Sequence, residues 1–307
     1  MLKFKKITLS DRALFEPRLK GLDCNMLNYN FVIQYIYRND IDFQFAYEDD
    51  FLFLKVHTDA GKEQFLMPVG EGDIDMALDK IMEYAFSQID NFTITQFCEH
   101  NAQYMIDWVE KHIDTHNLNY EFYPVRDEFE YMYLSEELVK LEGHILKPKR
   151  NRLNAFLRTY PDYTMEHINA DNIEEVRFFS KQWIDYKFEQ TQRERLKIES
   201  KALQETLNQY FAFNIDGIII RGDGQMVAFA VGCPLNDQTY LVLFEEADTQ
   251  YTGSYNIVNQ KFAEIIAPNY RYINRAEDCG VEGLRRAKLA YNPCFLNKVH
   301  HLFVYKT

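Results

Sequence analysis

Residues 216–232 read DGIIIRGDGQMVAFAVG and predict a β-hairpin. Apolar residues fill both arms, and Asp223-Gly224 between them is a dipeptide strongly favoured in two-residue hairpin turns. The stretch TYLVLFEE at residues 239–246 predicts a third strand, which completes a three-strand meander. A second run of three strands is predicted between residues 42 and 70. The chain therefore contains one meander in each half.

The order of the predicted elements around the meander is the same in both halves of the chain. A strand and two helices precede it, and a helix, a strand, a helix and a final strand follow it. The closing strands are EFEYMYLS at residues 128–135 and HLFVYK at residues 301–306. Sequence identity between the halves is not evident, so only the order of elements repeats. That order is the one used by the GCN5-related N-acetyltransferase (GNAT) fold.

We therefore predict an α/β (α+β) fold of two tandem GNAT-like domains, each a mixed sheet flanked by helices. Residues 1–145 would form the N-terminal domain, and residues 146–307 would form the C-terminal domain with the active site. A length of 307 residues agrees with two domains of about 150 residues each. The chain is 47% hydrophobic and 15% aromatic, which supplies two packed cores and excludes a disordered protein.

The composition also predicts where the protein resides. Its five cysteines are widely spaced and form no C-x-x-C pair, so we expect neither a disulfide framework nor a zinc site. The N-terminus lacks the apolar core of a signal peptide, and no run approaches the ~20 apolar residues that span a bilayer. These features predict a soluble cytoplasmic protein. A formal net charge of −13 argues against general affinity for nucleic acids or anionic membranes and leaves room only for a local basic site.

Residues 144–161, HILKPKRNRLNAFLRTYP, gather basic side chains in this acidic chain. Pro148 suits the first position of a helix, and Leu153, Phe156 and Leu157 give that helix an apolar stripe. The cations crowd its N-terminal end, where each costs about 0.3–1 kcal/mol against the helix dipole. Either an acidic surface offsets them, or they bind a polyanion such as a nucleic-acid backbone. The basic residues are Lys147, Lys149, Arg150, Arg152 and Arg158.

The turn after each meander is the place where a phosphate group would sit in this fold, because backbone N–H groups and the helix dipole favour an anion there. In the first half, PVGEGDID at residues 68–75 carries acids that would repel a phosphate, so we expect a supporting, non-catalytic role for that half. In the second half, Gln250 and Gly253 match the pyrophosphate loop of acetyl-CoA-dependent members. Tyr255 stands where that loop has a small residue, and it should obstruct a pyrophosphate.

Two blocks of the sequence resemble a known family. YLSEELVKLEGHILKPKRNRLNAFLRTYPDY at residues 133–163 is similar to the start of the C-terminal catalytic domain of phosphatidylglycerol lysyltransferases, with its strand, L-x-G turn and K-x-K-R-N-x-x-N-x-F helix. INRAEDCGVEGLRRAKLAYNP at residues 273–293 is similar to the family's N-R-x-x-D-x-G-x-x-G-L-R-x-A-K stretch. Together the blocks are specific, and the resemblance covers essentially the whole chain as a soluble, stand-alone member.

The resemblance implies transfer of an aminoacyl group from aminoacyl-tRNA to a hydroxyl or amine acceptor, with no further cofactor. The chain lacks the membrane-embedded portion of the full lysyltransferases, which argues against a lipid acceptor, although a small molecule and a lipid headgroup both stay open. The residues along the anionic donor would be Lys147, Lys149, Arg150 and Asn151. The reaction cavity would be lined by Asn274, Arg275, Asp278, Arg285 and Lys288.

An aminoacyl ester is already activated, so the protein needs only to position the substrates, accept a proton and stabilise an oxyanion. Asp278 would accept that proton or bind the amino group, unless it is a helix N-cap. Arg285 and Lys288 share a helix face and would steady a carbonyl oxygen or phosphate, unless that face is solvated. Tyr291 would donate a proton or lie in the core. The catalytic candidates are therefore Asp278, Arg275, Arg285 and Lys288.

No metal site is predicted. Glu245 and Glu246 are adjacent on a strand, so only one faces a cleft. His300 and His301 likewise are not expected to face inward together, and no third ligand is evident. Cys279 has no obvious histidine base nearby and is expected to be a small buried residue rather than a nucleophile.

The leading hypothesis is a tandem GNAT acyltransferase that uses aminoacyl-tRNA. One alternative is an acyl-CoA-dependent N-acyltransferase that binds its cofactor at the turn of Gln250 and Gly253. The other is a GNAT-fold binding protein without turnover. Tyr255 speaks against the first alternative, and the intact block at residues 274–288 speaks against the second.

Overall fold

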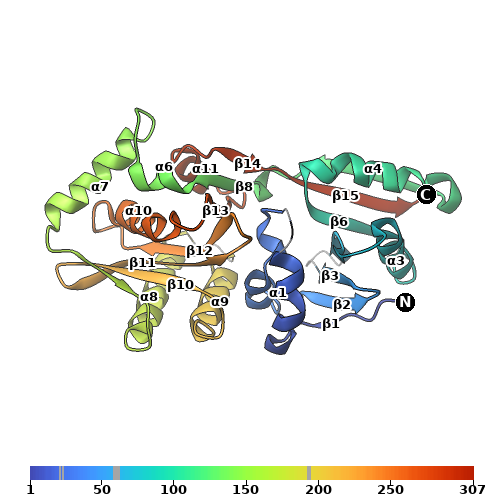
Figure 1. Cartoon of the computed structure of the whole chain (residues 1–307), viewed down its shortest axis with the longest axis horizontal. Helices are drawn as coiled ribbons and strands as arrows, with labels where there is room; N and C mark the ends of the chain where they lie inside the picture. Colours follow the sequence, from blue (N-terminus) through green and yellow to red (C-terminus); the bar gives the residue numbers. More distant parts are fainter. Residues whose placement is uncertain (21, 23, 58–62, 192–194) are drawn as a thin grey trace. The chain divides into compact units, whose positions relative to one another are not determined.

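The computed structural model describes the chain except for residues 21, 23, 58–62 and 192–194 (Figure 1), so the end of the second meander strand of the first half lies outside the described residues. The chain divides into two compact units. The first comprises Met1–Glu130 together with Asn297–Thr307, and the second comprises Tyr131–Leu296. Each unit contains one mixed sheet flanked by helices.

The sheet of the first unit has the strand order β1-β2-β3-β4-β6-β15-β7, with β5 paired to β3. Strands β4 and β6 are parallel at its centre, and their neighbours are antiparallel. The strands are β1 Lys5–Lys6, β2 Gln44–Glu48, β3 Phe51–His57, β4 Glu63–Leu66, β5 Val69–Gly70, β6 Asn91–Cys98, β7 Leu118–Pro124 and β15 Val299–Lys306.

The helices of the first unit cover a core that includes the fully buried Phe53, Phe65 and Phe92. Helix α3 begins where expected, because the Asp73 carboxylate accepts hydrogen bonds from the backbone N–H groups of Asp75 (3.0 Å) and Met76 (3.3 Å). The helices are α1 Arg12–Lys20, α2 Phe31–Ile36, α3 Ile74–Phe86, α4 Ala102–Glu110 and α5 Ile113–His116, with short 3₁₀ turns η1 Leu9–Asp11, η2 Leu27–Tyr29, η3 Glu99–Asn101 and η4 Arg126–Glu128.

The sheet of the second unit has the strand order β14-β8-β13-β12-β11-β10-β9. The expected hairpin joins β10 and β11, and Asp223 (φ 51°) and Gly224 (φ 75°) give its turn the left-handed conformation that such loops require. The strands are β8 Glu130–Leu134, β9 Thr164–His167, β10 Asp216–Gly222, β11 Gln225–Pro234, β12 Thr239–Ala247, β13 Tyr272–Glu277 and β14 Phe295–Asn297.

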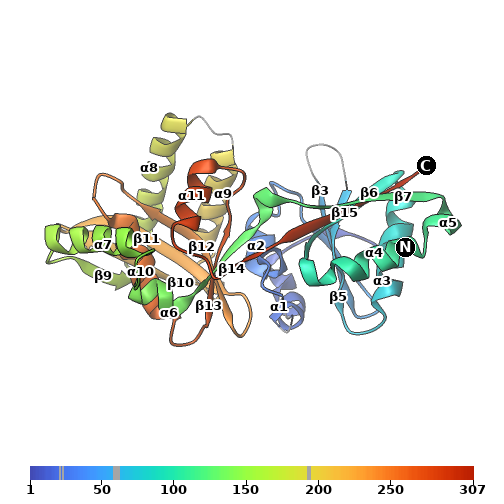
Figure 2. The same ribbon diagram turned by 90° about the horizontal axis from the view of Figure 1, so that it is seen from above.

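Helices cover both faces of this second sheet: α10 with α6 and α7 lies on one face, and α8 with α9 on the other (Figure 1). Helix α7 packs on α10 through the buried Leu153 and Phe156, as the apolar stripe predicted (Figure 2). The helices are α6 Ser135–Lys140, α7 Lys147–Thr159, α8 Ile173–Thr191, α9 Arg195–Asn208, α10 Ser254–Ile266 and α11 Glu282–Leu289.

The closing strands are exchanged between the two sheets. Strand β8 ends the first half of the chain but pairs in the second sheet, whereas β15 ends the chain and pairs with β6 and β7 in the first sheet. The sequence predicted that each half would close its own sheet. The expected boundary at residues 145 and 146 therefore falls between α6 and α7, inside the second unit. The alternation of apolar residues decides which face of a strand is buried, but it does not name the partner strand.

A parallel pair lies at the centre of each sheet, β4 with β6 and β12 with β13. With the helices on both faces, this arrangement confirms the expected GNAT-like α/β fold. In the second unit, β12 and β13 pair only from Thr239 with Tyr272 to Leu241 with Asn274. Both strands continue beyond these pairs, to Ala247 and Glu277. Their C-terminal ends therefore part, and the side chains there carry the candidate site.

Candidate active site

An ion pair joins the parted ends of β12 and β13. Nη2 of Arg275, on β13, donates to Oε1 of Glu245, on β12, over 2.8 Å. Both side chains are largely buried, with 13% and 8% of their surfaces exposed. Burial lowers the pKa of Arg275, but the carboxylate of Glu245 outweighs this effect and raises it, so the guanidinium stays charged. Arg275 was predicted as a catalytic residue, whereas Glu245 was considered only as a metal ligand.

Aromatic rings and two asparagines surround this pair. The guanidinium carbon of Arg275 lies 4.9 Å from the ring centroid of Tyr291 and 5.7 Å from that of Tyr133. Asn259 donates through Nδ2 to Oε2 of Glu245 (3.0 Å), and Asn256 donates to the hydroxyl of Tyr291 (2.8 Å). Both oxygens of Glu245 are therefore occupied, and Tyr291 lies in the core beside the site.

Two side chains that bond to Glu245 each keep one buried polar atom without a hydrogen-bond partner among the described residues, namely Nη1 of Arg275 and Oδ1 of Asn259. A buried polar group left without a partner costs about 1–3 kcal/mol, so such groups are rare in folded proteins. Sequence reasoning missed Asn259. Its signal is that Asn256 and Asn259 stand one turn apart on α10 and are only 6% and 4% exposed, although the other buried residues of that face are mostly apolar.

Asp278 is fully buried and its carboxylate is occupied by several donors. It accepts hydrogen bonds from the hydroxyl of Tyr131 (2.6 Å), from Nε and Nη2 of Arg285 (2.9 and 2.8 Å) and from the backbone N–H of Gly280 (3.0 Å). Burial raises the pKa of Asp278, but these hydrogen bonds outweigh burial and hold it well below its usual range. Helix α11 is capped by Val281, so Asp278 is not its N-cap. The geometry makes Asp278 and Arg285 a positioning pair.

Lys288 also fastens the segment that carries Arg275. Its ammonium donates to the backbone carbonyls of Arg275 and Glu277, each over 2.6 Å, and it is only 8% exposed, which excludes a solvated face. Asn274 accepts a hydrogen bond from the backbone N–H of Ala276 (2.8 Å), which has a positive φ of 56°. The predicted cavity residues thus come together, but most of them hold the backbone, and Arg275 is the member with a buried, unpartnered N–H.

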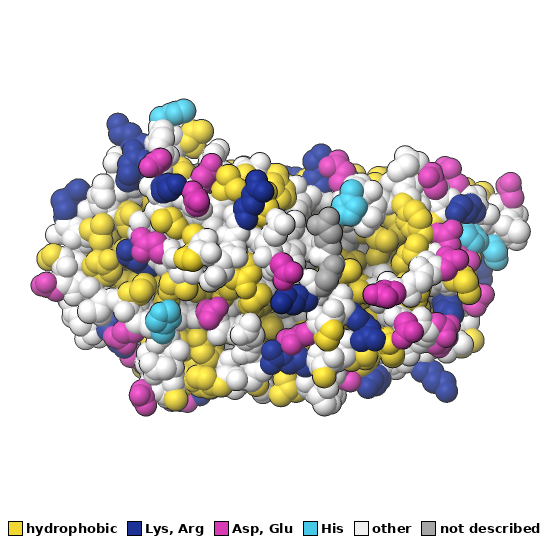
Figure 3. All heavy atoms as spheres, in the orientation of Figure 1, with side chains coloured by type: hydrophobic (Ala, Val, Ile, Leu, Met, Phe, Trp, Pro, Cys, Tyr) yellow, Lys and Arg dark blue, Asp and Glu magenta, His cyan; other side chains and the backbone are white. Residues whose placement is uncertain are grey.

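The basic side chains of α7 are not neutralised. Among the residues that the structure describes, no carboxylate pairs with Lys147, Lys149, Arg150, Arg152 or Arg158. Figure 3 shows dark-blue side chains over this helix. Of the two interpretations of the basic stretch, the offset by an acidic surface is therefore not observed.

Lys149 links α7 to Arg275. Its ammonium lies 4.1 Å from the ring centroid of Tyr291, the ring that also contacts the Arg275 guanidinium. Burial, and then the positive charges of Arg275 and Arg152, lower the pKa of Lys149 to about 8. Burial is the larger cause and the two arginine charges add to it, so an anionic ligand beside Lys149 would stabilise its charged form.

Arg150 has a different role from its basic neighbours. Its guanidinium donates to the backbone carbonyls of Leu141 and, over 3.4 Å, Gly143, so it joins α7 to the turn after α6. Leu141 has a left-handed conformation (φ 47°), and this bond satisfies a carbonyl at the end of α6. Asn151 is exposed on α7, as Lys147 is. Lys147, Lys149, Asn151 and Arg152 thus stay available to a ligand, whereas Arg150 supports the loop.

Helix α7 packs against the turn at which the coenzyme A alternative would bind a pyrophosphate. Gly253 has a φ of 87°, and a Cβ there would run into the carbonyl oxygen of Arg152 and lie 2.9 Å from Cβ of Phe156. The backbone N–H of Gln250 donates to the carboxylate of Asp248 (2.9 Å), so an internal anion already uses it. These contacts argue against a coenzyme A pyrophosphate at this turn.

The remaining residues named from the sequence do not form a reactive cluster. Burial raises the pKa of the Cys279 thiol, so it is a poor nucleophile. Burial also raises the pKa of Glu246, whose carboxylate lies 3.4 Å from the hydroxyl of Tyr255. His300 and His301 are both buried, because β15 is an interior strand of the first sheet, and as adjacent strand residues they point to opposite faces. Among the described residues, no three His, Cys, Asp or Glu side chains are placed to hold a metal.

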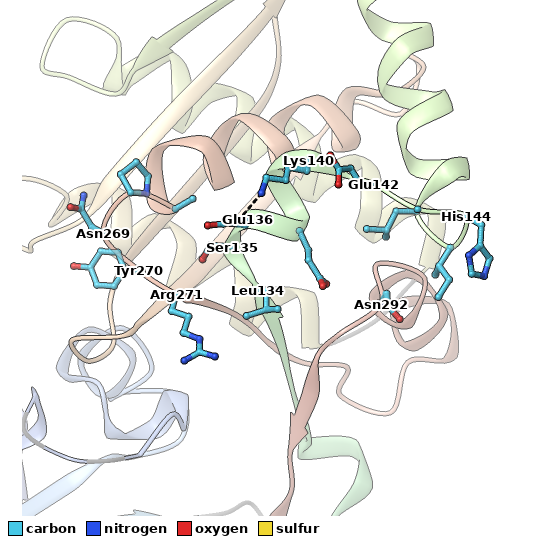
Figure 4. A pocket seen from close by; sticks show the side chains of 16 residues that line it. Leu134, Ser135, Glu136, Lys140, Glu142, His144, Asn269, Tyr270, Arg271 and Asn292 are labelled. Atoms are coloured by element: carbon cyan, nitrogen blue, oxygen red, sulfur yellow. Dashed lines mark hydrogen bonds and ion pairs between the residues drawn. The ribbon is translucent and has the colours of Figure 1, made fainter.

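A cavity of about 950 Å³ lies apart from Arg275 (Figure 4). It is lined by α6, the loop that leads to α7, and residues 267–271, and it includes the Glu136–Lys140 ion pair. Leu134 faces this cavity, whereas its neighbour Tyr133 lies beside Arg275.

Comparisons with known proteins place these features in a family. A family model described as phosphatidylglycerol lysyltransferase, C-terminal, matches residues 28–299. The chain is similar to the solved structure of a conserved protein of unknown function from Bacteroides thetaiotaomicron, with 33% identity, a TM-score of 0.91 and complete coverage (100%) of both chains. No helix among the described residues has the length and apolar character needed to cross a bilayer.

More distant relatives agree in fold. The structure of L-PGS from Bacillus licheniformis has 15% identity and a TM-score of 0.64, and the match covers 96% of this chain and 92% of that one. An uncharacterised protein of Mycoplasmoides gallisepticum is 24% identical over 203 residues, which are 63% of this chain and 60% of that protein. The match thus spans well under two thirds of the curated relative.

The hydrogen bonds of Asp278 predict a loss of stability in Asp278→Asn. The substitution removes a buried partner of Arg285, so the free energy of unfolding should fall by roughly 2–4 kcal/mol. Glu277→Gln is the matched control, because the Glu277 carboxylate pairs with Arg195, which is 53% exposed, and accepts a long hydrogen bond from the Cys279 thiol (3.4 Å). It should change stability by about 0–1 kcal/mol. Urea denaturation measures both. Equal stability of the wild type and Asp278→Asn would contradict the positioning role.

The contact between Gly253 and α7 predicts that Gly253→Ala destabilises the second unit by roughly 2–4 kcal/mol, since it combines a left-handed conformation with a clash. Gly224→Ala is the control, because Gly224 also has a positive φ but nothing lies within 4 Å of its added Cβ. The control should cost about 1–2 kcal/mol. Thermal or urea unfolding compares the two. If both variants lose the same stability, α7 does not close the turn.

Proposed function

The chain belongs to the family of phosphatidylglycerol lysyltransferase C-terminal domains, and from this premise we propose that it transfers an aminoacyl group from aminoacyl-tRNA to a hydroxyl or amine acceptor. Family and fold support an acyltransferase of the GNAT type. The proposal of aminoacyl-tRNA as the donor rests on the cations of α7, which have no carboxylate partner among the described residues. Lys149 connects this helix to Arg275, because both side chains contact the ring of Tyr291.

The positive charge of α7 indicates which kind of acyl donor the chain binds. The protein has a formal net charge of −13, yet among the described residues no carboxylate pairs with the cations of α7. These cations lie mainly at the N-terminal half of the helix, where the helix dipole adds to their positive potential. A chain of phosphates would neutralise several of them at once and release its own counterions. A nucleic-acid backbone therefore fits α7 better than a singly charged donor does.

The proposed reaction starts from the activated ester that links the aminoacyl group to tRNA. The nucleophilic oxygen or nitrogen of the acceptor attacks the acyl carbonyl carbon, and a new ester or amide bond forms. The bond to the ribose oxygen of tRNA breaks, and the proton of the nucleophile ends on that oxygen. Nη1 of Arg275 is a fixed, buried donor beside α7, and it would bind the carbonyl oxygen as negative charge develops. Asp278, Arg285 and Lys288 hold the segment that places this donor.

The two alternatives make different demands on the molecule. An acyl-CoA-dependent enzyme needs an open pyrophosphate turn, whereas Gly253 packs against the backbone of α7. A binding protein without turnover needs no oxyanion donor, whereas Arg275 keeps an unused buried N–H beside Glu245. Aminoacyl transfer accounts for both features. The acceptor is constrained only to carry a hydroxyl or an amine.

The proposal predicts salt-dependent binding of mixed charged tRNA, and it predicts that Lys149→Glu with Arg152→Glu weakens it. Each lost phosphate contact should lower the slope of log K against log salt by about 1, so the double variant should lower it by about 2. A fluorescence titration at several salt concentrations measures the slope.

The matched control is Lys3→Glu with Lys181→Glu, which makes the same change in net charge at exposed lysines outside α7. It should leave the slope unchanged. Binding that is absent in the wild type, or an equal loss in both double variants, would overturn tRNA as the donor.

A further inference from the structure

Two side chains that bond to the Glu245 carboxylate each have a second polar atom without a partner among the described residues. One of these atoms is a hydrogen-bond donor and the other is an acceptor. Glu245 holds Arg275 through one oxygen (2.8 Å) and Asn259 through the other (3.0 Å). Nη1 of Arg275 and Oδ1 of Asn259 remain buried without a partner. Because both side chains bond to one carboxylate, the free donor and the free acceptor belong to the same buried cluster.

The carboxylate also fixes which atom of Asn259 is available. Glu245 accepts the hydrogen bond, so the amide nitrogen of Asn259 must face it, since two oxygens would repel each other. The oxygen of Asn259 therefore points away from Glu245 and can only accept. Arg275 has no acceptor atom and can only donate. A ligand that satisfies both must offer an acceptor and, close beside it, an N–H or O–H group.

We propose that Arg275 and Asn259 together recognise the transferred group as an α-amino acyl group and discriminate against a plain acyl group. The acyl carbonyl accepts from Nη1 of Arg275, and the α-amino group, one carbon away, donates to Oδ1 of Asn259. The amino group is a donor whether it is charged or neutral. A plain acyl group offers the carbonyl alone and leaves Oδ1 of Asn259 buried and unpaired.

The surroundings support discrimination. The rings of Tyr133 and Tyr291 lie beside Arg275, and Asn256 fixes the hydroxyl of Tyr291. A substrate that leaves a buried polar group unpaired is rejected more strongly than one that merely loses apolar contact. This inference rests on the proposed function, because it assumes that the acyl group arrives on tRNA held by α7.

The test compares three forms of one tRNA: deacylated, carrying alanine, and carrying propanoate, the last two through a stable 3′-amide link. Alanyl and propanoyl groups differ only in the α-amino group, and both are small enough for any acyl site. We expect the full chain to bind alanyl-tRNA about tenfold more tightly than propanoyl-tRNA, the effect of one hydrogen bond to a buried acceptor. Equal affinities would overturn the inference without any variant.

Variants then assign the preference to Asn259. Asn259→Leu should reduce the ratio of the two affinities to about one and leave binding of deacylated tRNA within about twofold. Thr206→Val is the control, because it removes a buried hydrogen bond to Ala202 on α9, on the other face of the sheet, and should keep the ratio. A preference that survives Asn259→Leu would show that another group reads the amine, and would also overturn the inference.

The experiment tests tRNA binding and recognition of the α-amino group separately. If no form of tRNA shows salt-dependent binding, the proposed function fails, and the inference fails with it. If all forms bind with a steep salt dependence but alanyl and propanoyl tRNA bind equally, the inference alone fails. In that case water molecules, rather than a substrate, satisfy the two buried atoms.

Discussion

The ion pair between Glu245 and Arg275 is the contact on which the rest of the site depends. It spans the point where β12 and β13 part, and it needs both side chains to be held away from solvent. A buried guanidinium tolerates this position only because a carboxylate faces it and because backbone and side-chain hydrogen bonds fix the segment behind it. Lys288 and Asp278 supply those bonds. The stretch at residues 273–293 thus serves largely to hold one arginine, Arg275, in place.

Helix α7 is the second feature on which the proposed site depends. It is seated by apolar packing on α10, by Arg150 against the turn after α6, and by Gly253, whose lack of a side chain lets two backbones meet. The same contacts that seat the helix also cover the turn that would otherwise accept a pyrophosphate. In the proposed function, the cations of α7 bind the anionic donor in place of the closed turn.

Local features of this chain could be predicted because they depend on neighbouring residues. The Asp223-Gly224 turn, the Asp73 cap and the helix that begins near Pro148 all follow from backbone preferences within a few positions. The exchange of β8 and β15 could not, since alternation fixes a buried face and not a partner. The role of Asp278 was equally hidden, because its donor Tyr131 lies 147 residues away in the sequence. Asn259 was missed because it interrupts an apolar helix face only locally.

The proposed function requires that phosphates of tRNA approach Lys149, and the titration of this one ammonium group tests whether they do. NMR of the lysine side chains, assigned with Lys149→Arg, should show a pKa of about 8 in the free protein, below the ordinary 10.5. Saturating tRNA should raise that pKa, because phosphates stabilise the charged form. A pKa that saturating tRNA leaves unchanged would mean that no phosphate approaches Lys149 and would contradict binding of tRNA at α7.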